Sequence, residues 1–318
     1  MAFTPTSFRK RLLAWYDTHA RDLPWRENRD PYRVWLSEIM LQQTRVAAVI
    51  EHYREFLRRF PTVQKLGAAR EASVLAAWSG LGYYRRARML HAAARVLGGE
   101  FPETAEGWRR LPGIGRYTAA AIASISLGEA IAVVDGNVER VLQRVSGTRI
   151  RGEGLWQAAE QLLDHERPGD FNQAMMELGA TVCTPRAPMC LTCPLVELCA
   201  TRGAMAMPVK APPQKKRAIH YALSCREGAV FLVQRPPDAR LMAGMWELPE
   251  IAHPRGHTNL AFTLHHSITV TDYRVQVWKG VSPDRAAGEW IASRRLAKLA
   301  MTGLARKILR MASLSGGH

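Results

Sequence analysis

Hydrophobic positions up to about residue 200 recur at the spacing of amphipathic helices. Pro and Gly signals, which interrupt helices, separate the apolar stretches from one another. The pattern therefore predicts an all-α domain over residues 1–200. The predicted helical stretches are Phe8–Thr18, Tyr32–Phe60, Ala72–Leu97, Tyr117–Leu127 and Leu155–Leu163.

The pattern changes beyond residue 200. Residues 201–217 combine three prolines with five Lys or Arg side chains, a composition suited to an extended basic linker. Beyond the linker, we predict a smaller α+β domain over residues 218–318, since a chain of 318 residues usually forms more than one domain. Its predicted elements are β-type runs at 219–225, 229–234, 267–270 and 273–278, and a helical stretch over 293–311.

Composition indicates a folded protein outside the membrane. Apolar residues make up 47% of the chain and charged residues 23%, which excludes the disordered class. No apolar stretch reaches the roughly 18 residues of a membrane span. Residues 1–11 also lack the apolar core of a secretory signal. We expect a monomeric, cytoplasmic protein.

The charge balance favours a polyanionic partner. Lys and Arg number 44 against 28 Asp and Glu, a net charge of +16. Such an excess favours phosphate contacts and counterion release, so nucleic acid leads the candidates. Many soluble proteins are also basic, so charge alone does not identify the partner, and the sequence motifs are needed to do so.

Four of the five cysteines lie close together, as Cys183-x6-Cys190-x2-Cys193-x5-Cys199. In a reducing compartment this clustering suggests metal ligation rather than disulfides. Four thiolates on one compact loop suit a 4Fe-4S cluster. Zinc is the competing metal, although a zinc ribbon generally uses two Cys-x2-Cys pairs. Cys225 lies in a predicted strand, where we expect a buried apolar thiol rather than a ligand.

Residues 111–116, Leu-Pro-Gly-Ile-Gly-Arg, predict a tight hairpin that opens directly into a helix. Gly113 and Gly115 allow backbone N–H groups to approach a phosphate at the positive end of that helix. By itself the segment is equally compatible with a structural turn.

Two carboxylates have apolar surroundings in the sequence. Asp135 ends the run Ile-Ala-Val-Val, where it either caps the next helix or forms part of a site. Glu38 lies in Trp-Leu-Ser-Glu-Ile-Met-Leu. Desolvation there would raise its pKa, as suits a general acid at neutral pH, unless the side chain faces solvent.

Together and in this order, these features resemble the helix-hairpin-helix DNA glycosylases that carry an iron-sulfur cluster. Within that superfamily, residues from about 8 to 200 closely resemble the adenine DNA glycosylase (MutY) family. The resemblance implies a double-stranded DNA partner containing an adenine mispair, and a nucleoid-associated protein. It rests on four segments: Leu23–Arg26 (LPWR), Trp35–Thr44 (WLSEIMLQQT), Gly80–Tyr84 (GLGYY) and Phe171–Gly179 (FNQAMMELG).

The resemblance assigns chemical roles in adenine excision. It implies that Glu38 protonates the adenine ring as the general acid. It further implies that Asp135 stays ionised and stabilises the oxocarbenium-like sugar, with Tyr117 and Asn137 holding the site.

The resemblance also implies how DNA is bound. Trp25, Arg26 and Gln173 match positions that line the pocket of the flipped adenine. Gln43 and Tyr83 match residues that wedge into the duplex, and Leu41 and the hairpin glycines belong to the same DNA-contacting set. The simpler alternative is that these side chains are structural, an amide on the surface and an aromatic ring in the core.

Tyr117 separates two activities. Lyase-active relatives resembling endonuclease III have a lysine at this position, whose amine forms a Schiff base with the sugar. Tyr117 has no amine, which predicts a monofunctional glycosylase that uses water. The alternatives are an endonuclease III-like glycosylase and lyase for oxidised pyrimidines, and a non-catalytic DNA-binding protein.

The second domain resembles the Nudix-like C-terminal domain of the same family, through Gln234–Pro237 (QRPP) and Gly244–Pro249 (GMWELP). It lacks the glutamate-rich helix of a working Nudix hydrolase, so we expect no pyrophosphohydrolysis. In the family this domain recognises 8-oxoguanine with a Phe-Ser-His loop. Here Ile268-Thr269-Val270 aligns with the loop, so Thr269 keeps a hydroxyl while Val270 lacks a ring nitrogen.

Overall fold

A computed structural model of the chain describes residues 3–203, 205, 215–239, 241–252, 259–268, 271–280 and 287–314. The chain divides into two compact units. The first unit is formed by Met1–Gly67 and Ala92–Val209, the second by Ala68–His91 and Lys210–His318. Residues 68–91 thus belong to the same unit as the C-terminal part of the chain, an association that local sequence patterns do not indicate.

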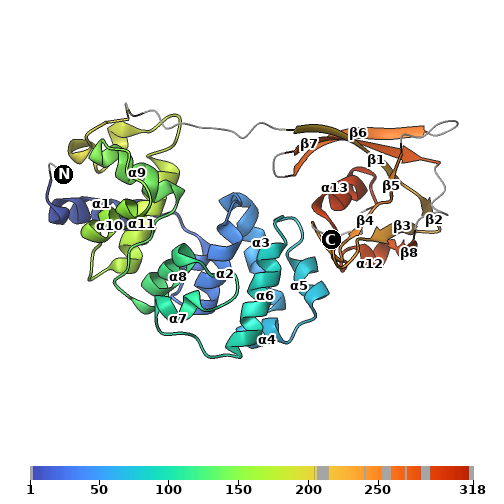
Figure 1. The fold of residues 1–318 in the computed structure, drawn as a ribbon, viewed down its shortest axis with the longest axis horizontal. Helices are drawn as coiled ribbons and strands as arrows, with labels where there is room; N and C mark the ends of the chain where they lie inside the picture. The colour runs from blue at the N-terminus through green and yellow to red at the C-terminus, as the bar shows by residue number, and fades with distance from the viewer. Residues whose placement is uncertain are drawn as a thin grey trace. The chain divides into compact units, whose positions relative to one another are not determined.

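The first unit is helical over its described residues (Figure 1). Its helices are α1 (Pro5–His19), η1 (Pro24–Arg26), α2 (Pro31–Leu41), α3 (Val46–Arg59), α4 (Val63–Gly67), α7 (Ala105–Arg109), α8 (Arg116–Ile122), η2 (Ala123–Leu127), α9 (Gly136–Ser146), α10 (Glu153–Leu162), α11 (Pro168–Thr181), η3 (Cys190–Thr192) and η4 (Val196–Leu198).

Two of the predicted helical stretches are each broken by a turn. The stretch 32–60 forms α2 and α3, because Gln43 adopts a left-handed φ of 55° between them. The stretch 72–97 forms α5 (Glu71–Ala77) and α6 (Arg85–Leu97), with Tyr83 at a φ of 47°. The apolar periodicity continues through both turns, so it does not predict where the helices end. At both turns a non-glycine residue adopts a left-handed conformation, which side chains disfavour.

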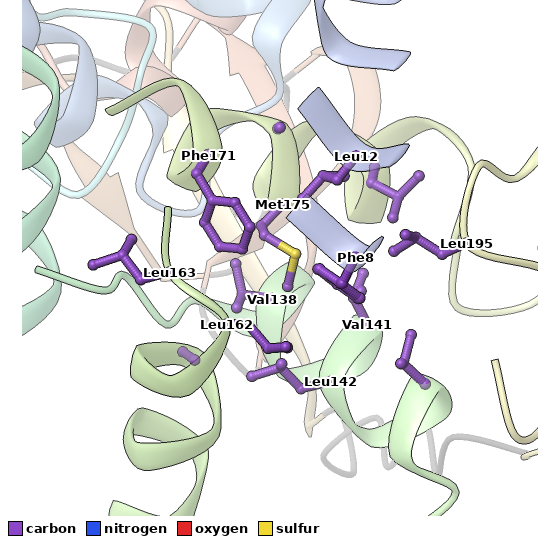
Figure 2. Close-up of a cluster of buried hydrophobic side chains, with 14 of the residues drawn as sticks. Phe8, Leu12, Val138, Val141, Leu142, Leu162, Leu163, Phe171, Met175 and Leu195 are labelled. Atoms are coloured by element: carbon purple, nitrogen blue, oxygen red, sulfur yellow. The ribbon is translucent and has the colours of Figure 1, made fainter. Parts of the chain in front are cut away.

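The core of the first unit holds α1, α9, α10 and α11 together (Figure 2). Phe8 and Leu12 of α1, Val138 of α9 and Phe171 of α11 are almost fully buried. The rings of Phe8 and Phe171 lie 6.2 Å apart. Burying these side chains stabilises the packing by about 25 cal/mol per Å² of apolar surface. The beginning of α9 is thereby held against α11.

The second unit contains two sheets in its described residues (Figure 1). One sheet has the order β5-β1-β7-β6, in which β1 and β7 are parallel and the other pairs antiparallel. The other has the order β2-β3-β4, with β8 also pairing with β3. The strands are β1 (Lys215–Ala222), β2 (Cys225–Arg226), β3 (Ala229–Gln234), β4 (Trp246–Glu247), β5 (Glu250–Ile251), β6 (Asn259–Ile268), β7 (Thr271–Lys279) and β8 (Gly288–Ala292).

A single apolar core joins both sheets to helix α13 (Gly303–Met311). Val275 of β7, Val230 of β3 and Ile308 of α13 are fully buried in it. Residues 68–91 are attached to this unit by the hydroxyl of Tyr84, which donates a hydrogen bond to the carbonyl of Met301 over 3.0 Å. An α+β unit in the C-terminal part of the chain is therefore observed. Strand β1 begins at Lys215, inside the predicted linker 201–217, and residues 204 and 206–214 of that linker lie outside the described residues.

Several details of the second unit differ from the predicted ones. Strand β6 begins at Asn259 rather than Ser267, and the closing helical stretch is split into α12 (Ser293–Leu296) and α13. Cys225 is exposed, contrary to the expected buried thiol, because β2 is a two-residue strand that pairs with β3 alone. Across the described residues, the helices are too short or too polar to cross a membrane.

Candidate active site

A cavity of about 720 Å³ in the first unit collects most of the predicted site residues. This volume is in the range of pockets that bind small molecules. The side chains come from η1, α2, the turn after α2, the glycine hairpin, α8, the start of α9, and α11. The predicted residues that line the cavity are Trp25, Arg26, Glu38, Leu41, Gln43, Gly113, Gly115, Tyr117, Asp135, Asn137 and Gln173.

Glu38 is a buried acid in the wall of this cavity. Its side chain is 6% exposed, because the apolar residues around it in α2 pack into the core. Burial raises the pKa of Glu38 to about 7; the hydrogen bond from Tyr117 and the charge of Arg26 lower it, and the negative charge of Asp135 raises it further. The expected desolvated carboxyl is confirmed, and the solvent-facing alternative is wrong.

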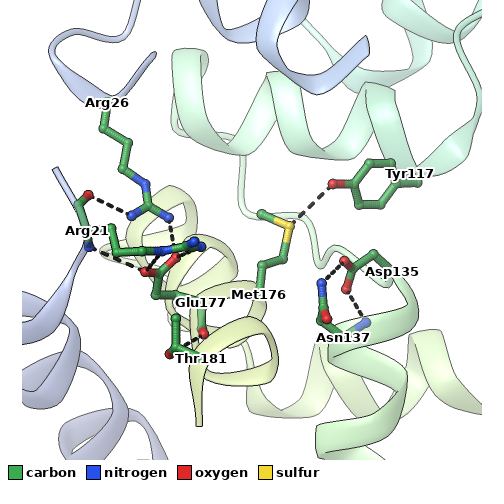
Figure 3. A network of polar contacts seen from close by, with 8 residues as sticks. All are labelled: Arg21, Arg26, Tyr117, Asp135, Asn137, Met176, Glu177 and Thr181. Carbon is green, nitrogen blue, oxygen red and sulfur yellow. Dashed lines mark hydrogen bonds and ion pairs between the residues drawn. The ribbon is translucent and has the colours of Figure 1, made fainter. Parts of the chain in front are cut away.

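Tyr117 lies at the start of α8, immediately after the glycine hairpin. Gly113 has a φ of 76°, and Gly115 is the residue that precedes the helix. The Tyr117 hydroxyl donates a hydrogen bond to Oε2 of Glu38 over 2.7 Å. It also lies 3.3 Å from the sulfur of Met176 (Figure 3). Burial raises the pKa of Tyr117 well above 10, so the phenol is a donor at neutral pH.

Asp135 caps α9 and also lines the cavity. The two alternatives considered for it, a helix cap and a site residue, are therefore compatible. Its Oδ1 accepts hydrogen bonds from the backbone N–H groups of Asn137 over 2.9 Å and Val138 over 2.7 Å. Its Oδ2 accepts from Nδ2 of Asn137 over 2.8 Å (Figure 3). These three hydrogen bonds hold the Asp135 side chain at the N-terminus of α9.

Two residues of α11 position the chain around Asp135. The amide of Asn172 is buried, accepts from the backbone of Val133 over 3.1 Å and donates to the carbonyl of Ile131 over 2.9 Å. Gly179 packs directly on Asn137, where a Cβ on the glycine would lie only 2.6 Å from the Cβ of Asn137. Only a glycine allows α11 to approach the start of α9 this closely.

Arg140 connects the cavity to the cysteine loop. Its Nη2 donates to Oδ1 of Asn137 over 2.8 Å, and its Nε donates to the carbonyl of Cys183 over 2.7 Å. One turn further along α9, Arg144 donates to the sulfur of Cys183 over 3.4 Å. Helix α9 therefore contacts the catalytic candidates at its beginning and the first cysteine along its length.

The four clustered cysteines line one pocket whose other walls are largely apolar. Arg144 contacts the sulfur of Cys183, and Gly203 packs so closely that a Cβ would lie 2.9 Å from the sulfur of Cys190. Burial raises the pKa of Cys193 to about 11. In the described part of the chain, no three His, Cys, Asp or Glu side chains converge on a single metal ion. The pocket supplies four sulfurs from one loop, the donor set of a cluster with four thiolate ligands.

Among the described residues, one predicted DNA contact, Tyr83, does not line the cavity. Tyr83 belongs to the second unit, where its side chain is 48% exposed and the guanidinium of Arg86 stacks on its ring at 5.4 Å. Thr269, with Val270, lies outside the described residues.

Arg21, Met176 and Glu177 also line the cavity, and no role is predicted for them from the sequence. Glu177 carries the same signal that identified Glu38, a carboxylate within an apolar helical run, here Ala-Met-Met-Glu-Leu. The local sequence therefore indicates a desolvated carboxylate at both positions. Nothing in the local sequence points to the sulfur of Met176 as a partner of Tyr117.

Comparison with known proteins agrees with this geometry. The family model described as "HhH-GPD superfamily base excision DNA repair protein" matches residues 36–162. A thermostable thymine-DNA glycosylase superposes with a TM-score of 0.59 at 30% identity, covering 63% of this chain and 97% of that one. A trapped endonuclease III–DNA intermediate, at 23% identity and a TM-score of 0.55 over 64% of this chain and 98% of that one, shares the fold. The helices, hairpin and cavity thus define a helix-hairpin-helix protein of the base-excision repair class.

Sequence relatives narrow the class. The human adenine DNA glycosylase is 42% identical over 77% of this chain and 58% of its own length. The adenine DNA glycosylase of Schizosaccharomyces pombe is 32% identical over 77% of this chain and 69% of its own length. The chain belongs to the adenine DNA glycosylase family. It spans about six tenths of the length of its mammalian relatives.

Proposed function

We propose that the protein is a monofunctional DNA glycosylase that flips out and excises adenine mispaired with 8-oxoguanine or guanine. The observation that carries the proposal is the buried Glu38, with a pKa of about 7, in one cavity with Asp135. A carboxyl that holds its proton near neutral pH can protonate a leaving purine. A second, ionised carboxylate can stabilise the positive charge that develops on the sugar.

The proton needed by the leaving base comes from Glu38. Adenine leaves more readily when its ring is protonated, because it then departs as a neutral base. Tyr117 orients the carboxyl by donating to Oε2, which leaves the other oxygen free to carry the proton toward the cavity. Tyr117 also has no amine, which supports hydrolysis by water rather than a Schiff base with the sugar.

Asp135 stabilises the oxocarbenium-like sugar. It accepts three hydrogen bonds, two from backbone N–H groups and one from the side chain of Asn137, which hold the carboxylate at the N-terminus of α9. Electrostatic stabilisation by a group that is already oriented requires little rearrangement during the reaction. Asn137 is in turn held by Arg140.

The flipped adenine occupies the cavity beside Trp25, Arg26 and Gln173, which supply an aromatic surface and hydrogen-bonding groups. Leu41, Gln43 and Tyr83 contact the duplex, and the hairpin at Gly113 and Gly115 binds a phosphate through its backbone. The net charge of +16 favours DNA binding in general.

Cys183, Cys190, Cys193 and Cys199 hold a 4Fe-4S cluster. When bound, the cluster supplies a rigid cross-link of the loop after α11, with Cys183 also contacted by Arg140 and Arg144. Residues 218–318 act as a Nudix-like domain that recognises the base opposite adenine. Thr269 contributes a hydroxyl to that recognition.

A single-turnover assay tests the function. Duplexes carry adenine opposite 8-oxoguanine, adenine opposite guanine, or an oxidised pyrimidine, and the products are analysed with and without alkali. We expect adenine release from both mispairs, with strand cleavage only after alkali. Release of the oxidised pyrimidine alone would refute the proposal, and strand cleavage without alkali would refute its monofunctional part.

A further inference from the structure

Glu177 is a buried carboxylate that joins two arginines at the wall of the cavity. Its side chain is 1% exposed on α11. Its Oε1 accepts from Nε of Arg21 over 2.5 Å, and its Oε2 accepts from Nη2 of Arg21 and Nη2 of Arg26, each over 2.9 Å (Figure 3). Burial opposes the charge of this carboxyl, but the bond from Arg21 and the charge of Arg26 outweigh it and lower the pKa of Glu177.

Arg26 is fixed by these contacts but retains an unused donor. Its Nη1 donates to the carbonyl of Arg21 over 3.0 Å, and its guanidinium stacks on the ring of Tyr16 at 5.5 Å. The buried Nε of Arg26 has no hydrogen-bond partner among the described residues. A buried donor without a partner is costly, so this one suits an acceptor that arrives with a ligand. The ring nitrogens of a purine are such acceptors.

The same contacts control the charge near Glu38. Arg21 and Arg26 bring two positive charges to the cavity, and Glu177 compensates one of them. The titratable and charged groups acting on Glu38 are the neutral phenol of Tyr117 on α8, the carboxylate of Asp135 before α9, and Arg26 of η1, whose charge lowers the pKa of Glu38. Without Glu177 the uncompensated guanidinium would favour ionised Glu38, which cannot donate a proton.

We propose that Glu177 is a positioning residue for adenine excision: its carboxylate clamps Arg26 directly and is itself held by Arg21, so that Arg26 presents its free donor to the purine. This inference rests on the proposed function and assigns Glu177 a role at the same site. Glu177 acts before the glycosidic bond breaks, because it fixes the orientation of Arg26 and so of the bound adenine. It also offsets the positive charge of Arg21 and Arg26 near Glu38.

The test is Glu177→Gln, which keeps the shape of the side chain and removes its charge. We expect single-turnover adenine excision to fall about 10- to 100-fold, the usual effect of losing a hydrogen bond between charged groups. We also expect the alkaline limb of the pH profile to move to lower pH, whereas a purely structural defect would leave it in place. The matched control is Glu106→Gln, which removes an exposed carboxylate from its pair with Arg110 outside the cavity and should change neither quantity.

A double-mutant cycle with Arg26→Gln keeps the test decisive if Glu177→Gln alone folds poorly, because the double variant removes both charges of the Glu177–Arg26 pair and leaves only the guanidinium of Arg21, which is 38% exposed to solvent. If Glu177 acts through Arg26, the double variant is no slower than Arg26→Gln alone. Additive losses, or wild-type rate and pH profile in Glu177→Gln, would overturn the inference. A wild-type protein that releases no adenine would instead count against the proposed function.

Discussion

The hydroxyl of Tyr117 donates a hydrogen bond to the buried carboxyl of Glu38 over 2.7 Å. Burial raises the pKa of Glu38, and this bond lowers it, so the acid is held near neutrality by two opposing effects. The glycine hairpin sets the position of Tyr117, while the packing of α2 sets the burial of Glu38. The acid is therefore tuned by elements that lie far apart in the sequence.

Glu38→Gln should reduce adenine excision about 100- to 10,000-fold, the range expected for removing a general acid. DNA binding should survive, since only a proton is lost. In the wild type, the protonated form is active and its pKa is about 7, so the rate should fall as the pH rises through 7. Single-turnover rates between about pH 5 and 9, together with a DNA-binding titration, measure both effects. Near-normal excision by the variant would exclude Glu38 as the acid.

Tyr117→Phe removes the hydrogen bond that lowers the pKa of Glu38. The pKa should therefore rise, and the alkaline limb of the pH profile should move to higher pH, opposite to the shift expected for Glu177→Gln. The rate on the acid side should fall about tenfold, because the carboxyl loses the donor that orients it. A limb that moves to lower pH, or does not move, would contradict the arrangement of these two residues.

Gly179→Ala should disturb the start of α9. The added methyl group would lie 2.6 Å from the Cβ of Asn137 and 2.9 Å from its carbonyl oxygen, so the helices must separate. We expect a loss of about 1–3 kcal/mol in the free energy of unfolding and slower excision. Gly303→Ala is the control, since a Cβ there meets nothing within 4 Å. Equal melting temperatures for the two variants would show that the close approach is unimportant.

The purified protein should be brown and contain about four irons per chain, as expected for one cubane cluster. Cys193→Ser should lower the iron content and the melting temperature, because one thiolate ligand is lost. Cys225→Ser, which changes an exposed thiol outside the loop, should leave both unchanged. A colourless wild-type protein with one zinc would replace the cluster with a zinc site.

Much of the site was predictable because its signals are local. Glu38 lies in a visibly apolar stretch, and the apolar run before Asp135 implies partial burial of that carboxylate. The glycines of the hairpin identify a turn that only small residues allow. Glu177 had a comparable signal, but its importance depends on Arg21 and Arg26, which are about 150 positions away in the chain.

The sequence by itself determined the helical first part, the sheet-rich second part, the clustered thiols and the residues that resemble a glycosylase site. Side-chain periodicity and residue chemistry are properties of short segments, so they can be recognised without coordinates. Only the tertiary structure decided that Tyr117 contacts Glu38, that Glu177 joins two arginines, and that residues 68–91 pack with the C-terminal unit. Those relationships depend on how buried surfaces fit together across long separations, which no local pattern specifies.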